Sequence, residues 1–200
     1  GLGSGMVVRW PGTVTPNSST DALVEYVDII PTFLDSASLP VPSGLDGRSF
    51  RNVLNGETNT HKDVVFGLQS SVGIILGPEH FGIRTARDKR YRYIRNLTPE
   101  VPFSNAVFRT DFWTEWTAAA EAGDPDAIIA VRRYQHRPAE ELYDCLKDPW
   151  NRHNLADDPA YTTVKARLST TLNTWMADQG DQGQPTEAAA KSRLYKNRER

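Results

Sequence analysis

The chain has 200 residues, 38% of them hydrophobic and 24% charged, a composition that fits one domain, or one and a half, with a genuine core. Its formal net charge is 23 − 25 = −2, so electrostatics give no reason to expect nucleic acid or an anionic membrane surface as a partner. The single cysteine excludes an internal disulfide framework, and no stretch approaches the roughly 20 apolar residues of a membrane span.

The chain opens with an apolar run at residues 6–10, which Pro11 and Gly12 end. This pattern predicts a buried strand that enters a turn. Residues 22–27 fit a strand or a helix equally well by periodicity. A buried α/β layer needs several parallel strands covered on both faces, and one strand is not enough. The opening segment therefore indicates the edge of a larger layer.

Asp28 is predicted to cap a short helix over residues 28–37, since Pro31 then falls in the first turn, where a missing N–H costs nothing. The apolar residues of this helix cover one side: Ile29, Ile30, Phe33, Leu34 and Ala37. A second short helix is expected over residues 49–54. Without the rest of the layer, the apolar side of the first helix is exposed, and we expect the isolated chain to associate.

The middle of the chain reads as an antiparallel sheet. Arginine and tyrosine alternate through residues 90–93, as in a hairpin with one wet face, and the charged turn 87–90 precedes them. The strands are expected at residues 64–68, 81–86, 91–96 and 141–144.

Three longer helices are predicted around this sheet. One spans residues 111–122, and a second starts at Asp124 and Pro125, which are a good N-cap and first-turn pair. The last spans residues 161–180, where apolar residues recur every three or four positions and form one stripe. Beyond it, residues 181–200 are polar and charged and predict a loosely docked tail.

The sequence contains no self-sufficient reaction centre. Its four histidines are His61, His80, His136 and His153. They lie far apart and lack the spacing of a zinc site. We interpret the acidic residues between 140 and 158 as a solvated surface with turn-forming Asp-Pro pairs. The basic residues at 132–137 favour a helix C-terminus that complements the helix dipole over a nucleic-acid site.

One segment, residues 77–84, has chemistry that favours a binding site. Glu79 and His80 form a titratable pair between glycines, and Arg84 follows closely. An arginine can bind two oxygens of an anionic ligand with its planar guanidinium. The alternative is a Glu–His contact that only caps a strand.

Four blocks of residues occur in a fixed order along the chain. They are Val7-Val8-Arg9-Trp10-Pro11-Gly12, Val27-Asp28-Ile29-Ile30-Pro31-Thr32, Leu45-Asp46-Gly47-Arg48-Ser49, and Glu141-Leu142-Tyr143-Asp144 with the Asp148-Pro149 and Asn154-Leu155-Ala156 that follow. In order and spacing, these blocks resemble the sulfatase family over residues 7 to about 178. Residues 92–100 and 136–140 are similar to the branch that includes heparan N-sulfatase and bacterial relatives.

The resemblance implies a fold of the α/β class, α+β in its C-terminal part. It is the C-terminal edge of an alkaline-phosphatase-like α/β/α sandwich, followed by a small four-stranded antiparallel sheet packed with a C-terminal helix. Residues 1–60 would then end the α/β domain, truncated at its N-terminal side. Residues 61–180 would form the sheet-and-helix subdomain, and residues 181–200 a polar tail.

The resemblance also implies the chemistry. The nucleophile of the family is a formylglycine made in a Cys/Ser-x-Pro-Ser/Ala-x-Arg motif, which does not occur here. The family's calcium ligands would precede Gly1, so we expect no metal ligand and no catalytic residue in this chain. We expect it to be inactive alone and to need the missing N-terminal sulfatase domain as its partner. The substrate would be a sulfated carbohydrate or a small sulfate ester, and the location periplasmic, secreted or lysosomal.

Within the family, we expect Glu79, His80 and Arg84 to lie at the mouth of the substrate pocket and to contact the substrate beyond its sulfate. Three other interpretations stay open. The chain can be a non-catalytic module that binds glycans, a part of a related phosphodiester or phosphonate hydrolase, or a vestigial fragment without a role.

Overall fold

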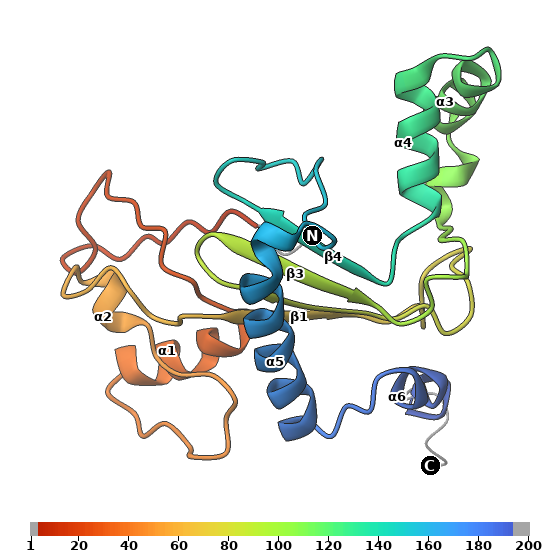
Figure 1. Ribbon diagram of the computed structural model, residues 1–200. Coiled ribbons are helices and arrows are strands. Elements are labelled where there is room, and N and C mark those ends of the chain that lie inside the picture. Colours follow the sequence, from red (N-terminus) through yellow and green to blue (C-terminus); the bar gives the residue numbers. More distant parts are fainter. Residues whose placement is uncertain (1–3, 194–200) are drawn as a thin grey trace. The chain divides into compact units, whose positions relative to one another are not determined.

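The computed structural model describes residues 4–193 (Figure 1). These residues form two compact units. The first consists of the chain up to Val65 with Arg87–Arg90, and the second consists of Phe66–Ala86 with the chain from Tyr91 onward. Within the described part, no helix combines the length and the apolar character that crossing a membrane would require.

The first unit contains little regular structure. Its helices are a 3₁₀ helix at Tyr26–Asp28, α1 at Ile29–Ser36 and α2 at Arg51–Leu54. Both predicted short helices are therefore present. The strand predicted at residues 6–10 is wrong, because these residues have no regular secondary structure. A strand needs a neighbour for its backbone hydrogen bonds, and Val7, 96% exposed, has no packed environment.

Asp28 organises the first unit. Its side chain is fully buried, but it does not cap α1 in the way the sequence predicts. Instead the carboxylate accepts hydrogen bonds from the backbone N–H of Glu25 at 2.9 Å and of Arg48 at 3.0 Å. The Lys62 Nζ lies 2.8 Å away. Burial raises the pKa of Asp28, but these hydrogen bonds outweigh it and hold the pKa below its ordinary value.

Further contacts join the sequence blocks around Asp28 and Gly47. The Thr32 hydroxyl donates to the Asp28 carbonyl and accepts from the backbone N–H of Phe50, which ties α1 to the chain before α2. Gly47 lies against Val27 so closely that a Cβ would be 2.0 Å from the Val27 carbonyl oxygen. Only glycine fits there, so the Asp28 and Gly47 blocks form one structural unit.

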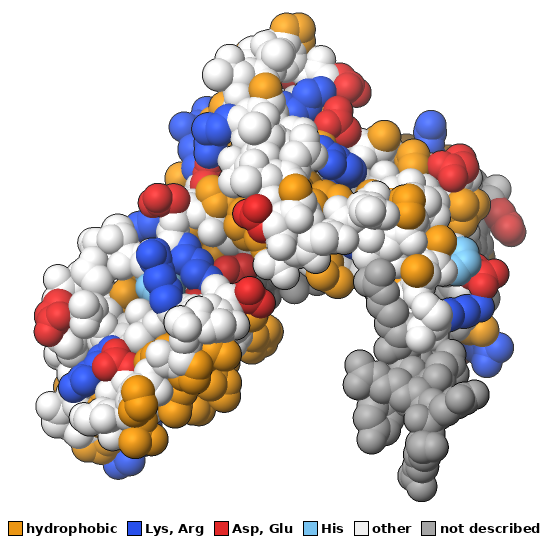
Figure 2. Space-filling model, turned by 90° about the horizontal axis from the view of Figure 1, so that it is seen from below, with side chains coloured by type: hydrophobic (Ala, Val, Ile, Leu, Met, Phe, Trp, Pro, Cys, Tyr) orange, Lys and Arg blue, Asp and Glu red, His pale blue; other side chains and the backbone are white. Residues whose placement is uncertain are grey.

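The apolar side of α1 is open to solvent. Phe33 is 67% exposed and Ile30 is 57% exposed, whereas the buried residues of the helix are Pro31 and Thr32. Tyr26 and Val27, just before the helix, are also exposed. Figure 2 shows hydrophobic side chains gathered on the part of the chain that carries this helix. This confirms the exposure that the sequence predicts for the helix.

Except for its end residues Val65 and Arg87, the predicted four-stranded antiparallel sheet lies in the second unit, with strand order β1-β2-β3-β4. The strands are β1 at Val65–Gln69, β2 at Ile83–Arg87, β3 at Tyr91–Asn96 and β4 at Glu140–Asp144. In the β3–β4 pair, Tyr93 lies opposite Leu142. Helix α5, Thr162–Asp178, packs on β3 and presents the predicted stripe through Leu168, Leu172 and Met176 (Figure 1).

A helical hairpin separates β3 from β4 in sequence. It consists of a 3₁₀ turn at Ala106–Arg109, α3 at Asp111–Glu121 and α4 at Pro125–Gln135. Asp124 caps α4 as predicted, because its carboxylate accepts from two backbone N–H groups of the first turn. Aromatic rings pack within the hairpin: Phe108 stacks on Trp113 with ring centroids 4.3 Å apart, and Trp113 on α3 contacts Tyr134 on α4 with centroids 5.2 Å apart.

The acidic residues of β4 differ from the predicted solvated surface. Glu141 and Asp144 are each 3% exposed. The Glu141 carboxylate accepts from the Tyr143 hydroxyl at 2.5 Å and from the Asn96 amide at 2.8 Å. Burial and this carboxylate raise the pKa of Tyr143. The Glu-Leu-Tyr-Asp block therefore stabilises the end of the sheet.

The tail also departs from its prediction. After α5, the chain forms α6 at Gln184–Ala188 and a 3₁₀ turn at Ala190–Arg193. Glu187 is 2% exposed, so the segment from Asp181 to Ala188 is docked rather than loose. The remainder of the predicted tail, residues 194–200, lies outside the described residues.

The contact at Gly47 gives a first test. We expect Gly47→Ala to lower the free energy of unfolding by about 1–3 kcal/mol, because the added methyl overlaps the Val27 backbone. Gly44→Ala is the matched control, since a Cβ there meets nothing within 4 Å. Urea unfolding of both variants measures the difference. Equal stability of the two would show that the close approach is not real.

Candidate functional site

Two of the three residues expected to bind a ligand, Glu79 and His80, lie on the loop between β1 and β2, which we call the 70–82 loop. Its backbone is unusual, because Gly73, Leu76 and His80 have φ angles of 91°, 60° and 58°. Leucine and histidine in this left-handed region each cost about 1–3 kcal/mol and persist only where the surroundings hold them. The loop is thus held in one conformation by contacts from outside it.

Glu79 and His80 come together on this loop, as predicted. The His80 Nε2 lies 3.5 Å from the Glu79 carboxylate, which is 60% exposed. Glu79 also accepts a hydrogen bond from Lys191. That bond and the positive charge of Lys191 hold the pKa of Glu79 below its ordinary value, so the carboxylate is ionised at neutral pH.

The imidazole of His80 has one unused position. Its Nδ1 is buried and has no hydrogen-bond partner among the described residues, while its side chain as a whole is 30% exposed. Ile75 and Leu76 on the same loop are exposed apolar residues. The loop therefore presents the Glu79 carboxylate, part of the His80 imidazole and apolar carbon to solvent, a combination that suits a ligand with hydroxyl groups and apolar faces.

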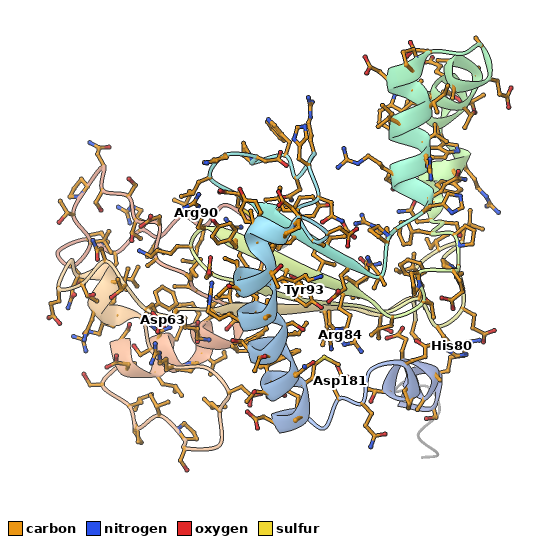
Figure 3. All side chains as sticks on the ribbon, in the orientation of Figure 1. Asp63, His80, Arg84, Arg90, Tyr93 and Asp181 are labelled. Carbon is orange, nitrogen blue, oxygen red and sulfur yellow. The ribbon has the colours of Figure 1, made fainter. Side chains whose placement is uncertain are left out.

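Arg84 does not lie with Glu79 and His80. It follows the loop on β2, and its side chain is 3% exposed, so its guanidinium cannot reach a ligand in solvent. The Arg84 Nε donates to the Asp181 carboxylate at 2.5 Å, and Nη1 donates to the carbonyls of Gln69 and Ile83 at 3.2 and 3.1 Å. Figure 3 shows Arg84 and Asp181 facing each other, with His80 nearer to α6. Arg84 is thus paired within the protein, beside the loop.

Two residues that the sequence did not indicate, Asp181 and Glu187, complete the buried group around Arg84. Glu187, on α6, lies 3.7 Å from the Arg84 Nη2. Its other oxygen accepts from the Ser70 hydroxyl at 2.8 Å and the Ser71 N–H at 3.0 Å. One signal for this docking is present in the sequence: Gly183 followed by Pro185 is typical of a helix start, and it indicates structure within the tail.

Asp181 is ionised within the group. Burial raises its pKa, but the hydrogen bonds from Arg84 and from the backbone N–H of Gly183 outweigh that effect and hold the pKa below its ordinary value of 3.8. A buried arginine is always charged, so it requires such a partner.

A second titratable group lies in the first unit, where His61 Nε2 is 3.3 Å from the Asp28 carboxylate. Burial lowers the pKa of His61, and the Asp28 charge only partly opposes it. Both side chains are buried and serve the local structure described above. Within residues 4–193, no three or more His, Cys, Asp or Glu side chains gather as metal ligands.

Comparison with solved structures defines the class of fold. A protein solved in complex with its substrate D-glucosamine-2-N,6-O-disulfate superposes with a TM-score of 0.62 at 18% identity, over 88% of this chain and 28% of that one. A phosphonate monoester hydrolase from Silicibacter pomeroyi gives a TM-score of 0.53 at 22% identity, over 88% of this chain and 29% of that one. These likenesses show that the chain shares the alkaline-phosphatase-like fold of these proteins.

Comparison of sequences defines the family. The family described as N-sulphoglucosamine sulphohydrolase, C-terminal, matches residues 2–100. An ulvan-active sulfatase from Formosa agariphila is 35% identical over 186 residues, which is 90% of this chain and 34% of that protein. The N-sulphoglucosamine sulphohydrolase of Homo sapiens is 29% identical over 196 residues, covering 86% and 38%. The chain belongs to the sulfatase family, as its C-terminal portion, and spans about a third of the length of these curated relatives.

The Arg84–Asp181 pair predicts a pH dependence. Because the pKa of Asp181 is lowered in the folded state, the ionised carboxylate stabilises the fold fully above pH 3.8, its ordinary pKa. This stabilisation is lost as the pH falls through the lower pKa of the folded state. Asp181→Asn removes this contribution. We expect the stability difference between wild type and variant to shrink as pH falls from about 5 to about 2, measured by urea unfolding. Stability curves that stay parallel over this range would contradict the assignment.

Proposed function

We propose that this chain is the C-terminal part of a sulfatase that hydrolyses sulfate esters of carbohydrate, and that the 70–82 loop forms one wall of its sugar site. The observation that carries the proposal is the Glu79–His80 pair, whose side chains are 60% and 30% exposed, on a loop with left-handed backbone at Leu76 and His80. Backbone strain of this kind concentrates at binding and catalytic sites. The relatives named for ulvan and for N-sulphoglucosamine support a sugar as the substrate.

The side chains of the loop have complementary roles in this proposal. The imidazole of His80 donates a hydrogen bond to a hydroxyl or sulfate oxygen of the sugar. The ionised Glu79 carboxylate accepts from a sugar hydroxyl and repels a sulfate placed directly against it. Together they fix which hydroxyl carries the sulfate that reaches the reacting centre. Hydrogen-bonding sites of this kind reject analogues that lack the matching group.

The reaction itself is assigned to residues outside this chain. The formylglycine motif of the family does not occur in the sequence. We therefore propose that the upstream portion of a longer protein supplies the nucleophile and binds the calcium ion, and that this chain acts in substrate recognition. The exposed apolar side of α1, with Ile30 and Phe33, is the surface that packs against that portion.

One alternative has a specific observation in its favour. The fold is shared with a phosphonate monoester hydrolase, so the fold alone does not distinguish a sulfate ester from a phosphonate ester. The sequence relatives favour sulfate. Assays of the longer protein with a sulfated sugar and with a phosphonate monoester separate the two: faster turnover of the phosphonate ester would replace the sulfatase assignment.

Substitution of His80 tests the sugar site. In the longer protein we expect His80→Ala to raise KM for a sulfated sugar about tenfold with little change in kcat, because it removes one hydrogen bond used equally in the ground and transition states. His153→Ala is the matched control, since the His153 side chain is 83% exposed and lies on a different loop. Steady-state kinetics measure both. Unchanged KM and kcat in His80→Ala would remove His80 from the site.

The exposed side of α1 gives a second test. Expressed alone, the 200-residue chain is expected to associate through this surface, because large apolar side chains exposed together favour contact with one another. Replacing Ile30 and Phe33 by serine should shift the sedimentation profile toward monomer without loss of helical signal. A sharp, reversible thermal transition and monomeric sedimentation of the unmodified chain would contradict the role given to α1.

A further inference from the structure

We propose that the C-terminal segment from Asp181 to Lys191 is a clamp that holds the 70–82 loop in its substrate-binding conformation, with Glu187 as the positioning residue. This inference rests on the proposed function, because it concerns the loop that we place against the sugar. It assigns a role to the segment that the sequence describes as a polar tail.

Glu187 connects the two ends of the loop. Its Oε1 accepts from Ser70 and Ser71, where the loop begins, and its Oε2 faces the guanidinium of Arg84, which follows the end of the loop. The carboxylate is buried, so no water competes for these hydrogen bonds. A single side chain thus fixes the spacing between the start and the finish of the loop.

At Gly82, the Glu187 carboxylate and Leu97 fill the space that a side chain would need. A Cβ at Gly82 would lie 3.1 Å from the Glu187 Oε2 and 2.7 Å from Leu97 Cδ1. Ser71 also bridges the loop internally, since its hydroxyl accepts from the backbone N–H of Phe81 at 2.9 Å. The two ends of the loop are therefore held against each other and against α6.

The segment also reaches the ligand-binding residues themselves. The Gln184 amide donates to the backbone carbonyl of His80 at 3.4 Å, and Lys191 donates to Glu79. Asp181 holds the segment in place, because it pairs with Arg84 and accepts from the backbone N–H of Gly183. Apart from the Asp181–Gly183 hydrogen bond, which lies within the segment, these contacts act on the loop or on Arg84 of β2.

This arrangement accounts for the left-handed backbone at His80. A strained conformation persists only when its surroundings over-determine it, and the clamp supplies those surroundings on one side of the loop. Loosening the clamp frees His80 to leave that conformation, and the fraction of molecules ready to bind the sugar falls. The apparent affinity falls by that fraction, whereas the chemistry at the reacting centre is unchanged.

Glu187→Gln in the longer protein is the test. It keeps the size of the side chain but removes the charge that faces Arg84 and one of the two accepting oxygens. We expect hydrogen exchange in the peptide covering residues 70–82 to accelerate at least about tenfold, and KM for a sulfated sugar to rise about tenfold with kcat nearly unchanged. The matched control is Glu141→Gln, which alters a similarly buried carboxylate whose partners are Asn96, Tyr143 and Arg137.

The outcomes separate the clamp from the site it serves. Faster loop exchange and higher KM in Glu187→Gln, with neither in Glu141→Gln, support the clamp. If Glu187→Gln leaves both unchanged while His80→Ala still raises KM, the clamp is overturned and the sugar site stands. If the loop loosens but KM does not change in Glu187→Gln or in His80→Ala, both the positioning role and the sugar site are overturned. If the two glutamine variants change loop exchange and KM equally, Glu187 contributes only to general stability, and the clamp is overturned.

Discussion

The buried guanidinium of Arg84 is the constraint on which the candidate site depends. An arginine stays charged at any pH the protein meets, so its burial on β2 requires nearby carboxylates and carbonyls. Asp181 and Glu187 are those carboxylates, and both come from the segment after α5. Once they are in place, α6 lies against the 70–82 loop. Ser70 and Ser71 of the loop then donate to the Glu187 carboxylate that also faces Arg84. A single buried charge thereby orders the segment, and the segment in turn shapes the loop that carries Glu79 and His80.

Much of the fold follows from local sequence signals. Helices α1, α3, α4 and α5 and the four strands begin and end close to their predicted residues, because caps, prolines and apolar periodicity act within a few residues. The strand predicted at residues 6–10 fails because a strand also depends on neighbours, which periodicity does not contain. The prediction of a loosely docked tail fails for a related reason. Arg84 and Asp181 are 97 positions apart, and no local pattern connects them.

The candidate site was predictable in chemistry but not in arrangement. Glu79 and His80 are adjacent in sequence and meet on the loop as expected, whereas Arg84 points into the protein to pair with residues that the sequence gives no reason to join to it. Three of the four blocks that carry the family resemblance prove to be structural. Asp28 and Gly47 fix the first unit, and Glu141 fixes the end of the sheet. The family is recognised through its scaffold, and substrate recognition is placed on a loop outside those blocks.

The most direct measurement is a crystal structure of the longer protein, inactivated at its nucleophile, with a sulfated monosaccharide bound. A sugar hydroxyl or sulfate oxygen within hydrogen-bonding distance of the His80 or Glu79 side chain, with Arg84 still paired to Asp181 beneath the loop, is the predicted result. A sugar bound with the 70–82 loop out of contact would contradict the assignment of this loop to substrate recognition.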